Sequence, residues 1–305
     1  MDDCVPEDRI DLSLHGVIIL SLDRIVKREH RPFGNEKSKT NKYRTLIHKY
    51  AKGGLYTLDA FLIKFNQLSY NHSMILNIYK PKSWTSTDVV RRVKSTLNLK
   101  KVGHAGTLDP LAEGVLIILT DQDTKKQMEF MSMQKEYVFE TALGVTSETY
   151  DLEGPFNFST SDTVFEKQDI ERVFGKYVGK IRQKVPAHSA VKHKGKPLYK
   201  YARRNELSEY MIPEKEVQIY SIEILDFDAS KEIPIMGKKL NLPVIKGRVI
   251  CGKGTYIRSL VNDIGNDLGT GAVLISLVRT RIGDYTVEQS KNVDDLSLLS
   301  LNLIQ

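Results

Sequence analysis

The apolar run at Val115–Thr120 limits the possible folds more than any other part of this sequence. Val115 to Leu119 are five consecutive apolar residues, the longest such run in the chain. A strand with apolar side chains on both faces is stable only where both faces are covered, so the run predicts a fully buried strand. A membrane span needs about 20 apolar residues, so none is expected. The chain has 305 residues, 41% of them apolar, enough for a sizeable core around such a strand.

Strand-like and helix-like segments follow one another without regular alternation. Extended segments are predicted at Ile75–Ile78, Val115–Thr120, Tyr137–Leu143, Glu216–Phe227 and Val244–Cys251. Helices are predicted from a cap at Thr85 or Ser86 to Leu97, at Ile170–Tyr177 and at Ile257–Leu268. Because strands and helices are mixed irregularly, the order favours an α+β fold over a doubly wound α/β fold.

The chain changes character near residue 73. Between Arg24 and Lys52, ten basic residues stand against two acidic ones, which predicts a solvated basic arm. Short apolar segments at Gly16–Leu22 and Leu55–Leu68 flank this arm. A transit peptide is an alternative, although five acidic residues among the first eleven argue against it. We therefore divide the chain into a basic N-terminal extension of unknown role, residues 1–73, and a main domain, residues 74–305.

The charge balance favours a polyanionic partner. There are 45 Lys and Arg against 38 Asp and Glu, a formal net charge of +7, so nucleic acid is the first partner to test. Cys4 and Cys251 stand far apart and form no disulfide framework, which is typical of a reducing cytoplasm. The histidines are scattered apart from His188 and His193, so the sequence offers no ligand set for structural zinc.

The densest unusual segment is Gly103–Gly114. It holds three glycines and the pair Asp109-Pro110 between a basic helix and the buried strand. This composition predicts a tight loop whose backbone can approach a ligand closely, with the Asp109 carboxylate held rigidly. The alternative is that Asp109-Pro110 simply turns the chain while His104 packs against its neighbours.

A second segment, Gly247–Arg258, nearly matches a phosphate-binding P-loop. Gly254 stands where that loop needs the hydroxyl that binds Mg²⁺, and an apolar strand ending in an acid comes far upstream, an unusual order for such a fold. A P-loop nucleotide hydrolase therefore stays an alternative.

A third segment, Lys192–Arg204, combines positive charge with aromatic rings. It contains six basic residues and no acid, with Tyr199 and Tyr201 between the cations. Cations neutralise phosphates and tyrosine rings can stack on bases, so the segment predicts a nucleic-acid surface. A merely solvated charged face is the alternative.

Taken in order along the chain, these segments resemble TruB-type tRNA pseudouridine synthases. The ten-residue run Gly103–Ala112 is the most specific match. The other matching positions are Lys80-Pro81 with Thr85-Ser86, Lys135 with Tyr137, Asp151 with Gly154, Ser189-Ala190 with Lys192 and Gly195, Leu198-Tyr199 with Tyr201-Ala202-Arg203, and Lys253–Arg258. The resemblance covers roughly Met74 to Leu296, and it accounts for the P-loop near-match as the arginine motif of the family.

The resemblance implies the pseudouridine synthase catalytic fold, a mixed and mainly antiparallel sheet flanked by helices with an RNA-binding cleft. The implied reaction is the isomerisation of uridine to pseudouridine at position 55, in the T-loop of tRNA. The base would be flipped out of its stack, at a cost of a few kcal/mol, before the reaction. The implied partner is the T-arm of tRNA; no cofactor, no metal, no membrane and no obligate protein partner is implied.

The resemblance also implies roles for individual residues. Asp109 would be the nucleophile, Tyr137 would stack on the extruded uracil and transfer a proton, and Arg258 would pair with Asp109. His104 would fill the space that the flipped base leaves. Further candidates for substrate or RNA contact are Lys80, Gly106, Thr107, Lys192, Lys194, Lys196, Tyr199, Lys253 and Tyr256.

The sequence departs from the family pattern at several positions. Ser83 stands where glycine is usual, His188 where tyrosine is usual, and Val185 replaces a proline, which puts local packing in question and not the chemistry. The catalytic domain would end near Leu296 and the chain stops at Gln305, so we expect no C-terminal PUA domain. A catalytically silent RNA-binding module is the main alternative to an enzyme.

Overall fold

The structure is a computed structural model that describes residues 73–159 and 165–296. Residues 1–72 lie outside the described part, and with them the basic arm and the apolar segments expected at Gly16–Leu22 and Leu55–Leu68. In the described ranges, no helix is both long and apolar enough to cross a lipid bilayer.

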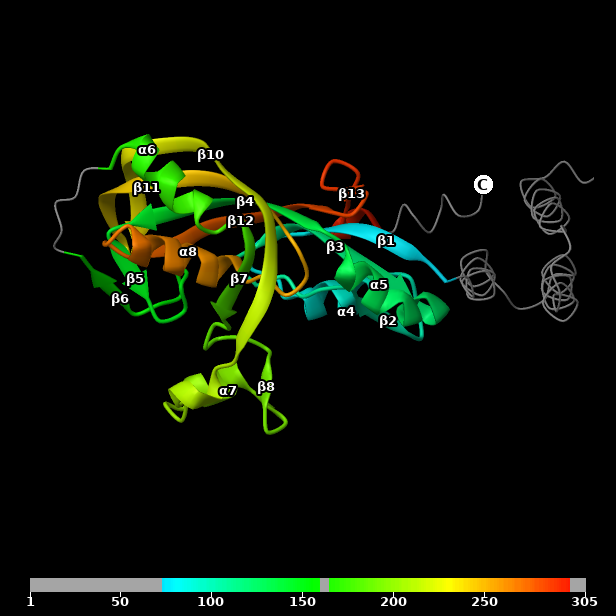
Figure 1. Cartoon of the computed structure of the whole chain (residues 1–305). Helices are drawn as coiled ribbons and strands as arrows, with labels where there is room; N and C mark the ends of the chain where they lie inside the picture. The colour runs from blue at the N-terminus through cyan, green and yellow to red at the C-terminus, as the bar shows by residue number, and fades with distance from the viewer. Residues whose placement is uncertain (1–72, 160–164, 297–305) are drawn as a thin grey trace, which may run out of the picture.

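One large sheet forms the centre of the molecule (Figure 1). Its strands are β1 (Ile75–Lys80), β2 (Val102–His104), β3 (Glu113–Thr120), β4 (Lys135–Leu143), β7 (Gly179–Lys184), β10 (Glu214–Ile235), β11 (Lys238–Cys251), β12 (Ala272–Ile282), β13 (Tyr285–Thr286) and β14 (Lys291–Asn292). Their order is β14-β1-β3-β12-β4-β11-β10-β7, with β2 on β3 and β13 on β12. Pairing is parallel between β1 and β14 and between β3 and β12, and antiparallel elsewhere in the sheet.

Helices and two small hairpins complete the fold. The hairpins are β5 (Val145–Ser147) with β6 (Phe156–Phe158) and β8 (Lys192–His193) with β9 (Lys196–Pro197). The helices are α4 (Ser86–Thr96), α5 (Gln127–Ser132), α6 (Lys167–Gly175), α7 (Leu198–Ala202) and α8 (Ile257–Asp267), with short 3₁₀ turns at Asp121–Lys126, Glu209–Met211 and Val293–Asp295. Together with the sheet they confirm the α+β fold and its mainly antiparallel pairing.

Strand β3 is buried on both faces, as its apolar run predicts. Leu116 and Ile118 belong to the cluster that Val89 and Val93 of α4 complete. Val115 and Ile117 alternate with them along the strand and belong to a different cluster, with Phe130 of α5. This double coverage explains why the strand has no polar alternation.

Helix α4 begins where its capping residues predict. The Thr85 side chain accepts from the amide of Asp88, and the Asp88 carboxylate accepts from the amide of Thr85 in return. This capping box satisfies two amides that a helix start leaves free. The predicted stripe of Val89, Val93 and Leu97 is buried.

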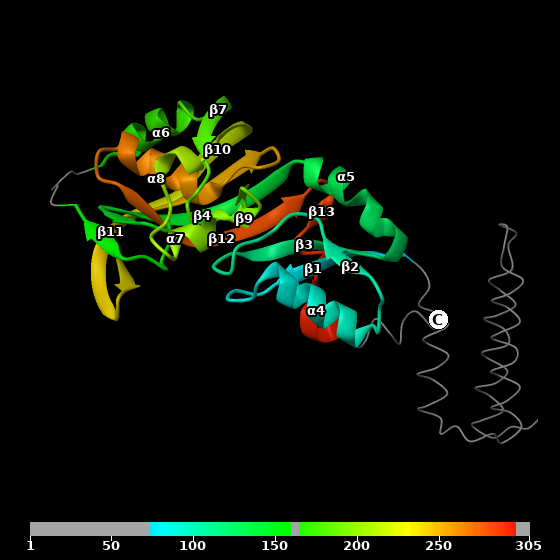
Figure 2. The same cartoon turned by 90° about the horizontal axis from the view of Figure 1, so that it is seen from below.

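Helices α6 and α8 cover the other end of the sheet, away from α4 and α5 (Figures 1 and 2). Leu260 and Ile264 of α8 share a core cluster with Phe174 of α6 and Phe139 of β4. At Gly247 of β11, a Cβ atom would lie only 2.4 Å from the Phe139 ring, so this position needs glycine for packing.

This packing overturns the P-loop interpretation of Gly247–Arg258. Gly247 to Cys251 is the end of β11, paired with β10 on one side and with β4 on the other. Backbone groups that pair within a sheet cannot also wrap around a phosphate. The nucleotide hydrolase is therefore not supported.

The segment with β8, β9 and α7 projects from the sheet beside the ends of β7 and β10 (Figure 1). Strand β7 and the central strand β12 were not predicted from the sequence, and β10 extends well beyond the predicted Glu216–Phe227. Irregularities at Asp228/Lys231 interrupt the alternation of β10, which explains why its second half was missed.

Candidate active site

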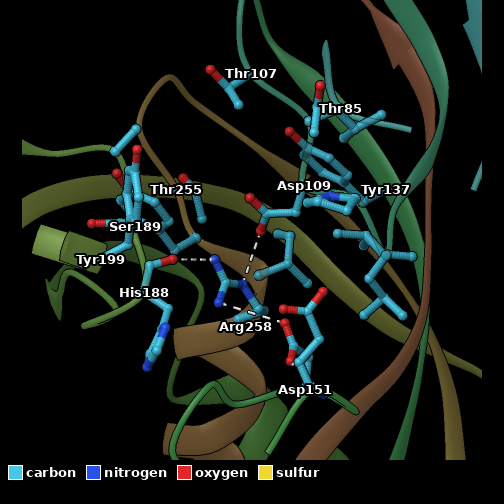
Figure 3. Close-up of a pocket in the computed structure, with 18 of the residues that line it drawn as sticks. Thr85, Thr107, Asp109, Tyr137, Asp151, His188, Ser189, Tyr199, Thr255 and Arg258 are labelled. Carbon is cyan, nitrogen blue, oxygen red and sulfur yellow. Dashed lines mark hydrogen bonds and ion pairs between the residues drawn. The ribbon is translucent and has the colours of Figure 1, made fainter. Parts of the chain in front are cut away.

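A cleft of about 550 Å³ opens between the two ends of the sheet. It lies where the loop after β2, strand β4, the start of α8 and the projecting segment with α7 meet (Figure 3). Asp109, Tyr137 and Arg258 all line it, and so do Thr107, Tyr199 and Tyr256. Six of the residues proposed from the sequence are thus brought together from segments far apart in the chain.

The carboxylate of Asp109 and the guanidinium of Arg258 are in direct contact, as the resemblance implied. Arg258 Nε donates to Asp109 Oδ2 at 2.9 Å. The Arg258 side chain is 6% exposed, whereas that of Asp109 is 38% exposed. The buried partner therefore holds the carboxylate in place while leaving it open to the cleft.

The remaining donors of Arg258 are also used (Figure 3). Nη1 donates to the carbonyl of Thr149 at 2.9 Å and lies 3.5 Å from Asp151 Oδ2, while Nη2 donates to the carbonyl of His188 at 3.0 Å. Three separate segments thus fix the plane of the guanidinium. His188 contributes its backbone carbonyl, so the contact is kept although histidine stands where the family usually has tyrosine.

Asp151 is a residue to which the sequence assigned no role. Its side chain is buried and accepts from Thr149 Oγ1 at 2.6 Å and from the amide of Glu153 at 3.0 Å. These bonds fix the second carboxylate beside Arg258, so that two anionic groups face one cation. The only sequence signal was its place in the Asp151–Gly154 motif.

The loop that carries Asp109 is held from α4. Ser86 Oγ donates to the Leu108 carbonyl at 3.1 Å and accepts from the Leu108 amide at 2.9 Å. The amide of Ser83 donates to the carbonyl of Pro110 at 2.7 Å. Backbone groups on both sides of Asp109 are therefore tied to the start of α4.

Tyr137 stands on β4 at the wall of the cleft, with 8% of its surface exposed. Burial raises the pKa of its phenol, and the positive charge of Arg279 lowers it in part. The hydroxyl therefore keeps its proton at neutral pH.

Lys80 requires a correction, because it cannot contact RNA. It is fully buried, and its ammonium donates to the carbonyls of Pro81 at 2.8 Å and Trp84 at 2.6 Å. Burial lowers the pKa of Lys80 to about 8. Its structural role is to hold the turn that precedes α4. Lys135 is buried in a similar way among carbonyls at the end of α5, and burial lowers its pKa to about 8.

Other proposed contact residues do not themselves line the cleft, although Gly106 and Lys253 are next in the chain to residues that do. Gly106, His104, Lys253, Lys192, Lys194 and Lys196 are not among the residues that line it. His104 is partly covered on β2, and burial lowers the pKa of its imidazole. Lys192 and Lys194 are exposed, whereas Lys196 pairs with Glu206 at 3.1 Å.

Gln183 is a positioning residue that the sequence did not indicate. Its amide nitrogen donates to the Tyr256 carbonyl at 3.0 Å and its oxygen accepts from the Tyr256 amide at 2.8 Å. Gln183 is 1% exposed, so both groups are satisfied within the protein. This bond pair ties β7 to the residue that caps α8.

No cluster of three or more His, Cys, Asp or Glu side chains in the described ranges is arranged to hold a metal ion. What the cleft offers instead is an aimed carboxylate, a phenol and a buried guanidinium. Such groups are suited to nucleophilic attack with proton transfer on a neutral substrate.

Comparisons with known proteins identify the family of the chain. The family model described as TruB family pseudouridylate synthase (N terminal domain) matches residues 94–257. The tRNA pseudouridine synthase B of Clostridium tetani is 40% identical over 223 residues, which cover 73% of this chain and 72% of that protein. The tRNA pseudouridine synthase B of Parabacteroides distasonis is 40% identical over 238 residues, 76% of this chain and 95% of that protein.

Solved structures show the same fold. A chain from a Cbf5-Nop10-Gar1 complex is 29% identical, with a TM-score of 0.52 over 73% of this chain and 53% of that chain. A chain from the archaeal box H/ACA sRNP Nop10-Cbf5 complex is 26% identical, with a TM-score of 0.51 over 77% of this chain and 55% of that chain. The present chain thus spans about half the length of these solved chains.

Proposed function

This chain belongs to the TruB family of pseudouridylate synthases, and we propose that it isomerises uridine to pseudouridine in tRNA, at position 55 of the T-loop. The observation that carries the proposal is the contact between the buried Arg258 and the half-exposed Asp109 at the cleft wall. The relatives named above supply the substrate class, and the site supplies the groups.

The reaction exchanges one bond of the ribose for another. The bond between C1′ and N1 of uracil breaks, a bond between C1′ and C5 forms, the proton leaves C5 and N1 gains one. No atom is gained or lost overall, so the reaction needs no oxidant, reductant or second substrate. Asp109 acts as the nucleophile that allows the base to leave and turn, because a carboxylate can attack, leave and accept a proton in one site.

Arg258 and Tyr137 assist this step. When RNA fills the cleft, water is excluded and the Asp109 carboxylate would be costly to bury without its partner guanidinium. The Tyr137 ring offers a face to the flipped uracil, and its protonated hydroxyl acts as a relay that gives up its own proton and takes the one that C5 loses.

Exposed cations of the projecting segment support binding of the T-arm. Lys192 and Lys194 point their charge to solvent beside the cleft-lining Tyr199 and Arg203. Phosphates of a stem that enters the cleft would meet these cations. We place the reaction in the cytoplasm, the compartment that the two lone cysteines of the sequence favour.

The test is conversion of an unmodified tRNA transcript without ATP or metal, followed by mapping of pseudouridine. We expect product at one uridine of the T-loop with the wild type and none with Asp109→Asn, which keeps the shape of the side chain and should bind tRNA within about threefold of wild type. A stem-loop of the T-arm alone tests the substrate class, and cytidine at the target position is its control. Product from verified Asp109→Asn would remove the nucleophile assignment, and binding without conversion by the wild type would identify a silent RNA-binding module.

A further inference from the structure

Arg279 is a buried cation on β12 that the reaction described above does not use. Its side chain is 2% exposed and does not line the cleft. In the described part of the chain, no carboxylate forms an ion pair with it. Burying an unpaired charge is costly unless all its donors are satisfied, so the position calls for an explanation.

The guanidinium of Arg279 binds the loop that carries Asp109. Nε donates to the carbonyl of Val115 at 2.7 Å, Nη2 to that of Gly106 at 3.2 Å and Nη1 to that of Thr107 at 3.4 Å. Gly106 and Thr107 come three and two residues before Asp109. The Arg279 side chain therefore connects this loop to β3.

Gly114, the last residue of the Gly103–Gly114 segment, lets β12 approach β3 closely at Arg279. At Gly114 (φ +103°) a Cβ atom would lie 2.4 Å from the carbonyl oxygen of Arg279, with which it pairs in the parallel β3–β12 contact. At Gly106 a Cβ atom would lie 3.8 Å from Arg279 Nη1, an ordinary contact distance, so its φ of +105° and not lack of space favours glycine there. Gly114 thus admits the backbone of β12, whereas the sequence led us to expect close approach of a ligand.

Arg279 also lies beside the second reactive group. It is the cross-strand partner of Tyr137 in the β12–β4 pairing, and its positive charge acts on the Tyr137 phenol. Tyr137 in turn forms part of the cleft wall, so Arg279 borders both the Asp109 loop and the strand position that carries Tyr137.

We propose that Arg279 is a positioning residue of the isomerisation: it fixes the Asp109 loop relative to its own cross-strand partner, Tyr137. This proposal rests on the proposed function. Arg279 acts through Asp109 and Tyr137 and has no contact with the substrate. Its loss should therefore slow the chemical step and leave tRNA binding almost unchanged.

The test compares Arg279→Lys and Arg279→Met with the matched control Arg281→Met on the same strand. Arg281 pairs with Glu136 at 3.4 Å and makes no bond to the Asp109 loop. For each full-length protein we would measure the single-turnover rate with excess enzyme, the Kd for tRNA, and hydrogen exchange of the amides in residues 103–112 without RNA.

Arg279→Lys keeps the buried charge, but a single ammonium cannot bond to all three carbonyls. We expect its single-turnover rate to fall about 10- to 100-fold, since small displacements of reacting groups have effects of this size. The Kd should stay within about threefold, and exchange in the loop should become faster, with Arg281→Met like the wild type throughout. The single-turnover rate of Arg279→Met should fall further than that of Arg279→Lys.

Several results would overturn the proposal. They are a rate of folded Arg279→Lys close to that of the wild type, unchanged exchange in the loop, or a loss of rate that a weaker Kd fully explains. If Arg279→Met does not fold, Arg279→Lys decides the question alone. An inactive wild type would refute the proposed function, while the exchange measurement would still decide whether Arg279 fixes the loop.

Discussion

At the scale of single residues, planar guanidinium groups hold the site by bonding to backbone carbonyls. Arg258 contacts Asp109 and two carbonyls, and Arg279 contacts three carbonyls of the loop and its neighbouring strand. The shape of the group matters here as much as its charge, because a rigid fork binds several acceptors at fixed angles.

This geometry makes Arg258→Lys a severe change although the charge is kept. An ammonium cannot reach Asp109 and the carbonyls of Thr149 and His188 together, so we expect the single-turnover rate to fall about 100-fold or more. The measurement is conversion of tRNA with saturating enzyme. Arg172→Lys on α6, where the arginine is 76% exposed, is the control and should change nothing. Similar rates for Arg258→Lys and wild type would show that the fork geometry is unimportant.

Ser83 is strained in a way that its replacement can reveal. Its φ is +69°, in the left-handed region that favours glycine, the residue that the family pattern usually has there. We expect Ser83→Gly to raise the free energy of unfolding by about 0.5 to 1 kcal/mol, measured by urea denaturation. Ser95→Gly, within α4, should lower it by about 0.5 kcal/mol. If both changes lower the free energy of unfolding, Ser83 is not strained.

Individual residues of the site could be predicted from the sequence only where they belong to a recognisable family motif. The contact of Asp109 with Arg258 followed from the resemblance, because the spacing of 149 positions gives no local signal. Gln183 and Arg279 carry no such mark, since each is a single polar residue whose partners come from distant segments. Lys80 was misassigned because a sequence does not show whether a lysine is exposed or buried.

At the scale of secondary structure, periodicity identified the elements with strong apolar patterns. Helices α4, α6 and α8 and strands β1, β3, β4 and β11 lie where the pattern predicts them. Strand β12 was missed although it lies between β3 and β4, because it combines an apolar start with Arg279 and Arg281 and contains two irregularities in pairing. Strand β7 is an edge strand with alternating charges, which resembles a loop in sequence.

The projecting segment with β8 and α7 gives a prediction at this scale. Lys192 and Lys194 are exposed, so replacing both with alanine should weaken the binding of tRNAs with different sequences to the same extent. The slope of log K against log salt should fall by roughly 0.7 to 0.9 for each phosphate that the altered protein no longer neutralises. Lys167→Ala on α6, at the opposite side of the molecule in Figure 1, is the control. An unchanged slope would show that the segment is only a solvated charged face.

At the scale of the whole molecule, buried cations should make stability depend on pH. The pKa of Lys80 is lowered from 10.5 to about 8, so between these values the unfolded chain binds more protons than the folded one. The contribution of Lys80 to stability therefore rises with pH through this window. We expect the unfolding free energy of the wild type relative to Lys80→Met to increase between pH 8 and about pH 10. Lys135, whose pKa is also lowered to about 8, is present in both proteins, so its effect cancels. A difference in unfolding free energy that does not change with pH would refute the lowered pKa of Lys80.

The division of the chain also predicts what shortening does. All cleft-lining residues lie at or after Thr85 in sequence, and the backbone of Met74 is bonded to Thr120 of β3. A chain that begins at Met74 should therefore convert tRNA at saturating concentration, with weaker binding if the basic arm contacts RNA. Pseudouridine mapping is the measurement, with circular dichroism as the control for folding. A folded but inactive short chain would make the extension part of the catalytic unit.

The parallel contact of β3 with β12 has a consequence for synthesis on the ribosome. Gly114 can pair with Arg279 only after the ribosome has added Arg279, which comes more than half the chain length later in the sequence. At roughly 5 to 20 residues per second this delay is about 10 to 30 s. During that time the start of β3, at Glu113 and Gly114, has one edge without its final neighbour, although Ile118–Thr120 can already pair with β2. An open strand edge of this kind favours aggregation. Nascent chains of this protein are therefore expected to depend on chaperones until the last tenth of the sequence emerges, and pseudouridine formation can begin only after that.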